Sequence, residues 1–302
     1  MLTKNKPTVS GFTFIKNGLS LGYPILESIQ SISELCDEVI ISVGFAPNST
    51  QDDGTEEYLR SHLSASKYKF IRSTWDPQTI AKGQGLILSE QTNVALRECH
   101  GKYCQYIQAD EVVHENDLPL IEDGIKKLEA SPKLHALIFN YLHFYGNVDV
   151  LKHTRNTYRR EIRTIRNHQG IISWLDAQGF RFQDGRKIPA TLLAGARIFH
   201  YGWCRQEMIM NSKIKAMDIL YHDQDQLPQD PRFKYERIWG LRPFTESHPQ
   251  IMKEWIALHR NQVDIFSLPI KFEWKNLGLA AADFIESLTD YRLGEYKGYI
   301  IR

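Results

Sequence analysis

The sequence predicts an α/β protein with a mainly parallel sheet flanked by helices and a C-terminal extension. Over the first 146 residues, apolar strand-like runs alternate with segments of helical periodicity, and strands joined by single helices form parallel sheets covered on both faces. The 302 residues and 42% hydrophobic composition are enough to bury a sizeable core. Polar residues follow successive strands, as expected at the ligand-binding edge of such a sheet.

Five strands and four helices alternate in the first half. The first strand lies within residues 7–18 and closes on Asn17-Gly18, and the helix after it has apolar residues at helical spacing. Thr55 is expected to cap the second helix and Asn116 the fourth. The other expected strands are 37–44, 67–73, 103–110 and 135–146, and the other expected helices are 55–65, 85–101 and 116–131.

The alternation changes after about residue 150. We expect a half-exposed strand at 157–167, a turn-rich segment at 170–187, a strand within 192–203 that ends at His200, and a helix at 205–223. Because no internal repeat or low-complexity linker interrupts the chain, these elements favour one compact domain whose second half builds on the first.

The near-zero net charge argues against partners that are attracted by the electrostatic field of the whole protein. Lys and Arg number 37 against 36 Asp and Glu, for a net charge of +1, so no nucleic-acid partner is predicted and an anionic ligand must be held by local groups. No stretch approaches the ~20 apolar residues of a membrane span, and no signal peptide is recognised, so we expect a cytoplasmic protein. The four cysteines form no CxxC pair and are expected to be free thiols.

The expected carboxyl ends of the strands place Asp110 and Glu111 at the edge where parallel sheets bind ligands. A divalent cation such as Mg²⁺ or Mn²⁺ is typically held by one or two carboxylates together with the oxygens of a diphosphate. The other interpretation of this acidic pair is a solvated turn before a helix. GxGxxG, GxxxxGK[ST], GxSxG and HExxH motifs are all missing, which argues against dinucleotide cofactors and P-loop chemistry.

Four segments together resemble glycosyltransferase family 2, the nucleotide-sugar-dependent transferases of GT-A (Rossmann-like) fold. They read "VSGFTFIKNG", "DEVIISVGFAPNSTQDDGT", "EQTNVALRECHGKYCQYIQADE" and "RIFHYGW". The resemblance covers roughly residues 8–220. It implies a GT-A domain at 1–220, with a nucleotide-binding half at 1–120 and a metal and acceptor half at 121–220, and a C-terminal extension at 221–302 packed on the domain. Gln108 departs from the family pattern, because it stands where the first Asp of the family's acidic pair would be.

The resemblance assigns roles to individual residues. It implies a divalent cation, Mn²⁺ or Mg²⁺, held by Asp110 with Glu111 second and completed by His200. Asp176 is the implied catalytic base, with Asp184 as the alternative. The implied contacts to the nucleotide are Phe12, Thr13, Phe14, Asn17, Gly44, Asp52, Asp53, Lys82, Gln91, Asn93, Gln108 and Lys213, although Asp52, Asp53, Lys82 and Lys213 also suit ordinary turns or solvated faces.

The expected reaction is transfer of a sugar from a nucleotide-sugar donor such as a UDP-sugar to a carbohydrate or glycolipid hydroxyl. Inversion, metal dependence and a role in surface polysaccharide or lipopolysaccharide synthesis are what the resemblance implies. The aromatic and apolar pattern of residues 291–302 suits packing on a partner chain in a homodimer and equally suits capping the protein's own core. A sugar-nucleotide nucleotidyltransferase and a non-catalytic nucleotide-sugar-binding protein are the alternatives. Trp174, Phe180, Trp203 and Trp239 could stack on a sugar ring, although most large aromatics serve packing, and Arg163 and Arg166 could contact phosphate or simply face solvent.

Overall fold

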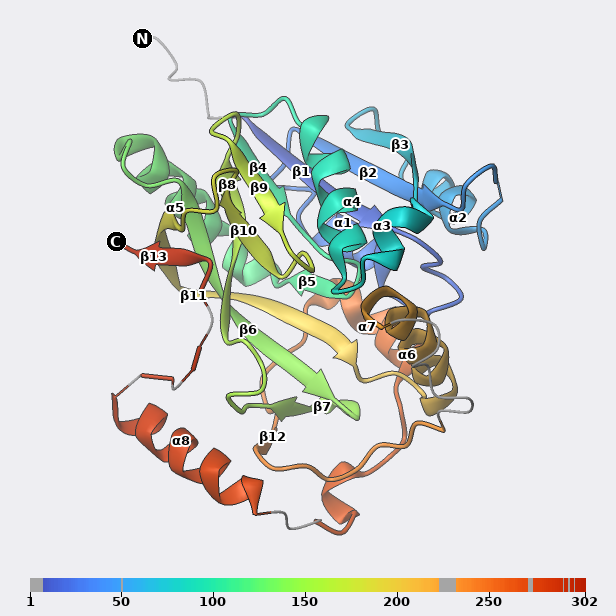
Figure 1. Cartoon of the computed structure of the whole chain (residues 1–302), viewed down its shortest axis with the longest axis vertical. Helices are drawn as coiled ribbons and strands as arrows, with labels where there is room; N and C mark the ends of the chain where they lie inside the picture. Colours follow the sequence, from blue (N-terminus) through green and yellow to red (C-terminus); the bar gives the residue numbers. More distant parts are fainter. Residues whose placement is uncertain are drawn as a thin grey trace.

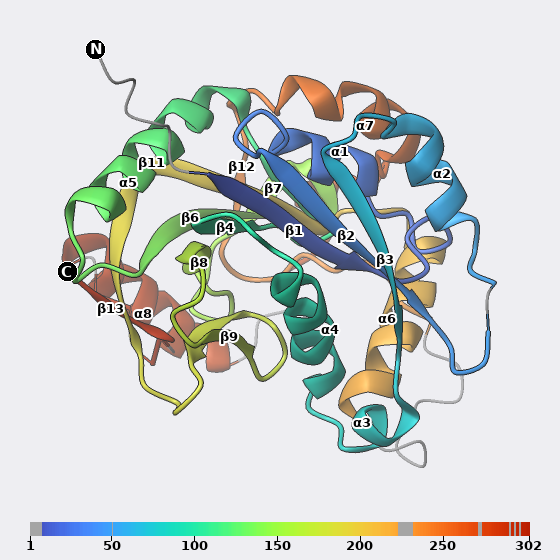
Figure 2. The same cartoon turned by 90° about the horizontal axis from the view of Figure 1, so that it is seen from above.

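The computed structural model describes residues 8–49, 51–222, 232–270, 274–289, 291–292, 294–295 and 297–302. Its centre is one large twisted sheet with helices on both faces (Figure 1, Figure 2). The predicted α/β class is therefore confirmed.

Parallel strands build the first half of the sheet. They run in the order β4-β1-β2-β3, with β1 paired to both β2 and β4. All eight residues of β2 are buried, as expected for a central strand covered on both faces. The bounds are β1 Val9–Ile15, β2 Glu38–Phe45, β3 Tyr68–Thr74 and β4 Tyr103–Tyr106.

The second half extends the same sheet with strands of mixed direction. β8 (Arg160–Arg166) joins it antiparallel to β4, and β6 (Ala136–Tyr145) lies between β8 and β7 (Asn147–Lys152). β11 (Ile188–Trp203) runs parallel to β6 and also pairs with β5 (Glu111–Val113). The segment expected to be turn-rich forms a hairpin of β9 (Ile171–Trp174) and β10 (Gly179–Phe182).

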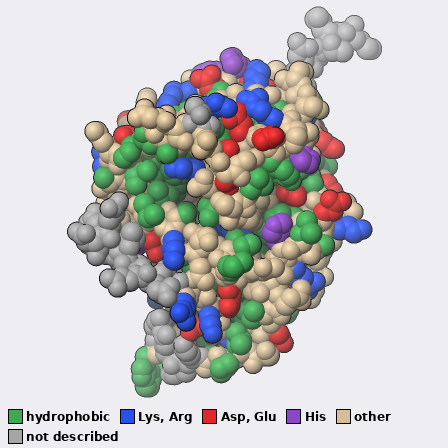
Figure 3. Space-filling model, turned by 90° about the vertical axis from the view of Figure 1, so that its right-hand side faces the viewer, with side chains coloured by type: hydrophobic (Ala, Val, Ile, Leu, Met, Phe, Trp, Pro, Cys, Tyr) green, Lys and Arg blue, Asp and Glu red, His purple; other side chains and the backbone are tan. Residues whose placement is uncertain are grey.

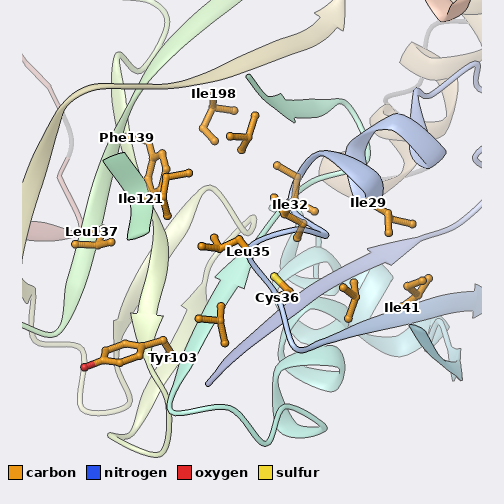
Figure 4. Packing of buried hydrophobic residues seen from close by; sticks show 14 of the residues in the cluster. Ile29, Ile32, Leu35, Cys36, Ile41, Tyr103, Ile121, Leu137, Phe139 and Ile198 are labelled. Atoms are coloured by element: carbon orange, nitrogen blue, oxygen red, sulfur yellow. The ribbon is translucent and has the colours of Figure 1, made fainter. Parts of the chain in front are cut away.

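Helices cover the two faces of the sheet. α1 (Ile25–Ser31), α2 (Thr55–His62) and α5 (Leu118–Ala130) lie on one face, where their apolar side chains pack with the sheet in a single core cluster (Figure 2, Figure 4). The other face carries α3 (Pro77–Ala81), α4 (Leu86–Arg97) and α6 (Glu207–Tyr221) (Figure 2). Figure 4 shows how this cluster joins α1, α5 and β6, which contribute Ile29, Ile121 and Phe139 respectively.

The C-terminal segment adds short elements around this core. β12 pairs with β7 and β13 pairs with β11, so two of these elements belong to the main sheet. The bounds are β12 Leu241–Pro243, η3 Gln250–Met252, α7 Lys253–His259, η4 Ile265–Ser267, α8 Lys275–Thr289 and β13 Tyr299–Ile301. Among the described helices, none combines the length and apolarity needed to cross a lipid bilayer. All four cysteines lie in the described part of the chain, are buried and form no disulfide.

Several predictions for individual elements are wrong. The strand expected at 103–110 ends at Tyr106, and β8, expected to be half-exposed, has five of its seven residues buried. Gly54, at φ 90°, is the cap of α2, because the hydroxyl of Thr55 instead accepts from the backbone N–H of Gly18 at 2.9 Å. α5 begins at Leu118, after a short 3-10 turn (η1, Glu115–Asp117) that is capped by His114 rather than by Asn116. β11 continues to Trp203, so His200 lies inside this strand.

Candidate active site

A cavity of about 590 Å³ opens at the carboxyl ends of the parallel strands. Its lining comes from the ends of β1 and β3, the turn between β4 and β5, β11, α6 and the β9–β10 hairpin. It contains the side chains of Asp110, Asp176, His200 and Lys213. The structure therefore brings together the predicted metal, diphosphate and base residues, which are up to 103 positions apart in the chain.

Asp110 is the negative centre of the cavity. The residue is 8% exposed. Its carboxylate accepts from Lys213 Nζ at 2.9 Å, and Arg205 Nη2 lies 3.8 Å away. Burial alone would raise the pKa of Asp110, but the charges of Lys213 and Arg205 hold it well below its usual value. Asp110 is thus ionised, and two cations face one carboxylate, so the group carries an excess of positive charge.

Arg205 adds a buried cation that the sequence did not reveal. It is 0% exposed and lies over the ring of Tyr23 at 4.2 Å. Within the described part of the chain, its three side-chain nitrogens have no hydrogen-bond partner. A buried guanidinium that makes no hydrogen bond is costly, even with Asp110 3.8 Å away. Its charge therefore favours an anionic group near Asp110.

Hydrogen bonds fix the orientation and the proton of His200. β11 and β6 place His200 directly beside His143, and the two Nδ1 atoms are 3.0 Å apart. His143 Nε2 lies 2.6 Å from the carbonyl oxygen of Tyr158. A carbonyl only accepts, so His143 carries its proton on Nε2 and His200 must donate from Nδ1. Burial lowers the pKa of both histidines, which favours these neutral forms.

With these protons assigned, two hydrogen-bond acceptors face each other: Nε2 of His200 and Oδ1 of Asp110. The remaining lone pair of His200, on Nε2, points to within 3.6 Å of Asp110 Oδ1. Gly202 leaves the space beside them open, because a Cβ there would lie 2.7 Å from His200 Nε2 and 3.2 Å from Asp110 Oδ2. One carboxylate and one neutral imidazole thus fit a divalent cation whose other ligands are substrate oxygens and water. Among the described residues, no cluster of three or more metal-ligating side chains occurs.

Glu111 points away from this site despite its position next to Asp110. It is fully buried and forms two 2.8 Å bonds with Arg163 and a third with the hydroxyl of Tyr141. Its backbone N–H and carboxylate also bond to Gln108. Glu111 and Arg163 therefore form a structural ion pair, which leaves Asp110 as the carboxylate of the cavity.

Gln108 and Asp176 are linked through the β9–β10 hairpin. The amide nitrogen of Gln108 donates to the carbonyl of Ala177 at 3.1 Å, so this residue holds the turn that carries Asp176. Leu175 and Ala177, on either side of Asp176, have φ of 52° and 62°. Such left-handed non-glycine residues cost free energy and are frequent at functional sites. The turn presents Asp176 to the cavity, where Tyr221 donates to it at 3.4 Å.

The predicted nucleotide contacts at β1 divide into two groups. Phe14 and Asn17 line the cavity, whereas Phe12 and Thr13 are buried, and Phe12 stacks on Tyr106 inside the core. Sequence reasoning missed Lys16 and Trp75, whose ammonium and ring lie 4.7 Å apart in the cavity wall. Their positions directly after β1 and β3 were the signal that could have found them.

The loop after β2 uses its polar groups to hold itself together. Asp52 accepts from the backbone of Gly54 and Glu56, and Asp53 accepts from Ser20 and Thr55. Neither carboxylate lines the cavity.

Gly44 leaves room for the Trp75 side chain that lines the cavity, because a Cβ at residue 44 would lie 2.1 Å from Trp75 Nε1. Lys82 is exposed at the end of α3. Gln91 is buried, and its amide nitrogen donates a hydrogen bond to the carbonyl of Thr74. Neither of these two side chains lines the cavity.

The remaining candidates lie at several places. Trp203 lines the cavity, and Trp174 lines a second cavity described below. Phe180 is core, Trp239 bonds to Asp283, and Asn93 bonds to the backbone of Ser173. Asp184 pairs with Arg186 in an exposed turn. Arg166 donates to the backbone carbonyls of Ser131 and Leu134, just after α5. The surface drawn in Figure 3 intersperses acidic and basic side chains, consistent with the near-zero net charge.

The fold and the cavity define a class of α/β protein whose strand-end site suits an anionic ligand with a bound cation. No protein-family model matches the sequence, and no curated protein matches it significantly.

Solved structures are similar over part of the chain. TarS 1-349 from S. aureus, also solved in complex with UDP, is 17% identical over 45% of this chain and 36% of that chain, with a TM-score of 0.30. Glucosyl-3-phosphoglycerate synthase from Mycobacterium tuberculosis, in complex with Mn²⁺, UDP and phosphoglyceric acid, is 19% identical over 46% of this chain and 44% of that chain, with a TM-score of 0.31. The chain thus spans less than half the length of these structures.

Proposed function

We propose that this protein is a glycosyltransferase of family 2 with a GT-A fold, which transfers a sugar from a nucleotide-sugar donor to a hydroxyl acceptor. The observation that carries the proposal is the strand-end cavity in which Asp110 and the Nε2 lone pair of His200 face each other beside the ammonium of Lys213. A divalent cation and a diphosphate together satisfy this set of charges.

The nucleotide would enter along β1 and β3. Phe14 and Trp75 offer aromatic surface for a base, and Lys16 and Asn17 lie in the same wall. Lys16 is half-buried, and burial lowers its pKa, so a phosphate beside it would favour its charged form. The diphosphate would lie nearer Lys213, whose charge is likewise disfavoured by burial and supported by Asp110.

Asp110 and His200 would hold the cation, Mn²⁺ or Mg²⁺. When bound, the cation supplies Lewis-acid stabilisation of the charge on the departing diphosphate. The buried cationic side chains Lys213 and Arg205 add fixed positive charge near the same place, which costs no reorganisation during the reaction.

Asp176 is the proposed base for an inverting transfer. The acceptor oxygen forms a bond to the anomeric carbon while the bond from that carbon to the diphosphate oxygen breaks, and the diphosphate leaves with the electron pair. The acceptor proton moves to the Asp176 carboxylate. Asp184 is a poorer candidate, because it is paired with Arg186 in an exposed turn outside the cavity. Surface polysaccharide or lipopolysaccharide synthesis is the proposed biological setting.

Calorimetric titration of UDP and GDP, with and without Mn²⁺, tests the nucleotide and cation parts of this proposal. The wild type is expected to bind one of the two nucleotides at least tenfold more tightly with Mn²⁺, and Asp110→Asn is expected to lose that gain. Asp184→Asn, a matched change of an exposed carboxylate, is expected to behave as the wild type. Failure to bind either nucleotide under both conditions would overturn the proposal, and equal binding with and without Mn²⁺ would overturn the cation site alone.

Turnover separates an enzyme from a binding protein. A stabilising donor is first found by thermal shift with UDP-, GDP- and dTDP-sugars, since a ligand of the folded state raises the unfolding temperature. Slow hydrolysis of that donor without acceptor is then expected in the wild type and should fall at least a hundredfold in Asp176→Asn. Equal hydrolysis by both proteins would exclude Asp176 as the base.

A further inference from the structure

A second cavity of about 550 Å³ adjoins the first one. The two cavities share three lining residues, Asp176, Gln178 and Tyr221. The turn that carries Asp176 is therefore the partition between them. A group bound in either cavity can contact the same carboxylate from its own side.

The walls of the second cavity combine an aromatic surface with hydrogen-bonding groups. Trp174, half-buried on β9, contributes its indole, and the guanidinium of Arg181 lies 5.7 Å from the centre of that ring. Gln178 Nε2 donates to Glu161 Oε1 at 2.6 Å. Carbohydrates present apolar ring faces and many hydroxyls, and they suit a site that offers aromatic surface together with amide and carboxylate groups.

The charges of the cavity select against an anionic ligand. Three carboxyl groups line it, those of Glu161, Asp176 and Asp218, against one guanidinium, that of Arg181. Burial raises the pKa of Glu161 to about 7, so the negative charge of the cavity lies mainly on Asp176 and Asp218. Glu161 is 2% exposed, so its hydrogen bonds are made in a water-poor setting. A phosphate or carboxylate on the ligand would meet like charges, whereas a hydroxyl can donate to them.

We propose that the second cavity is the acceptor subsite of the transferase and that it takes an uncharged carbohydrate. This inference rests on the proposed function. The sugar ring lies on Trp174, its other hydroxyls donate to carboxylates of the lining, and the reacting hydroxyl reaches Asp176 at the partition. That hydroxyl gives its proton to Asp176 as its oxygen bonds to the anomeric carbon and the nucleoside diphosphate departs from the other cavity.

Saturation-transfer NMR with small sugars tests this subsite without turnover. The probes are methyl glycosides of glucose, galactose and mannose, compared with glucose 6-phosphate and glucuronate, each added with UDP and Mn²⁺. The wild type is expected to bind at least one neutral glycoside and to bind the two anionic sugars at least fivefold more weakly. Trp174→Ala should weaken glycoside binding at least tenfold, whereas Trp239→Ala, which changes an exposed tryptophan outside both cavities, should leave it unchanged.

Two further readouts keep the result interpretable. UDP affinity should be unchanged in Trp174→Ala, so loss of glycoside binding with retained UDP binding isolates the acceptor subsite from the donor site. Asp218→Lys, at the cavity wall, should strengthen binding of glucose 6-phosphate severalfold and provides a test even if Trp174→Ala does not fold. The proposal is overturned if no neutral glycoside binds, if the anionic sugars bind better, or if the two tryptophan variants behave alike.

Discussion

The positions of two protons determine what His200 presents to Asp110. The carbonyl of Tyr158 orders His143, and His143 in turn orders His200. Residues that orient a metal-ligating histidine through its second ring nitrogen commonly change metal affinity by 10–100-fold when they are replaced. His143 is therefore a positioning residue that acts through His200.

We expect His143→Phe to weaken Mn²⁺ binding by about 10–100-fold, because His200 loses its acceptor and can place its proton on Nε2, facing Asp110. His143→Asn, whose amide oxygen can still accept, should retain most of the affinity. Electron paramagnetic resonance of free Mn²⁺ measures the binding, and ¹⁵N NMR of the imidazoles reports the tautomer without metal. A His200 proton already on Nε2 in the wild type would refute the hydrogen-bond assignment.

Glu161 gives the folded state a specific pH dependence. Burial raises its pKa to about 7 from a usual value of 4.5. The folded protein therefore retains a proton that the unfolded chain releases, so this group lowers the free energy of unfolding as pH rises from about 4.5 to about 7.

We expect Glu161→Gln to stabilise the protein at pH 8 by up to about 3 kcal/mol relative to the wild type, with little difference below pH 4.5. The glutamine oxygen can still accept from Gln178. Urea unfolding at the two pH values measures the difference. A difference that is equal at both pH values would show that the carboxyl does not titrate abnormally in the folded state.

The turn from Trp174 to Gln178 shows backbone strain used to place one side chain. Leu175 is 43% exposed and has φ of 52°, a region that glycine enters without cost. We expect Leu175→Gly to raise the free energy of unfolding by up to about 1 kcal/mol, because little packing is lost and the strain is relieved.

Leu120→Gly is the matched control for this change. Leu120 is also partly exposed, but it lies in α5, where glycine is expected to cost about 1 kcal/mol. Denaturant unfolding compares the two variants. Equal destabilisation by both would mean that the turn stores no strain at Leu175.

Element by element, regular periodicity made the first half of the chain predictable. The parallel strands and their helices follow apolar patterns of period 2 or 3.6, which local residues determine. The β9–β10 hairpin was less visible, because strands of four residues give too few alternations. The end of β11 was misplaced because polar His200 looks like a terminus, whereas pairing to both β5 and β6 continues the strand to Trp203.

The candidate site was predictable where a strand end or the family resemblance identifies a residue. Asp110 and Asn17 follow strands, Phe14 lies near the end of β1, and all three line the cavity. Asp52 and Asp53 also follow a strand, but their carboxylates accept from nearby backbone N–H groups, and sequence alone does not reveal which acceptors are already used. The contributions of Arg205 and His143 come from the assembled fold, since their partners are distant in the chain.

At the scale of the whole molecule, one buried ion pair connects the two halves of the sheet. Glu111 precedes α5 and Arg163 lies on β8, 52 residues later, and both side chains are 0% exposed. Arg163 also donates to the carbonyl of Gln178 in the hairpin that carries Asp176. The pair therefore connects the sheet with the turn at the active site.

We expect Arg163→Met to lower the free energy of unfolding by about 3–5 kcal/mol, because it leaves the Glu111 carboxylate buried without its partner. The double variant Glu111→Gln with Arg163→Met should recover part of the loss, since no charge is then buried. Denaturant unfolding of the two variants and the wild type measures this coupling. A double variant that is less stable than Arg163→Met alone would contradict the explanation.

Gly202 offers a criterion for sorting related chains. The space beside Asp110 and His200 exists because residue 202 has no side chain. A homologue with alanine there could retain both ligands and still have no room for the ion between them. The residue at position 202, rather than the acidic pair itself, would then distinguish related proteins that bind the cation from those that do not.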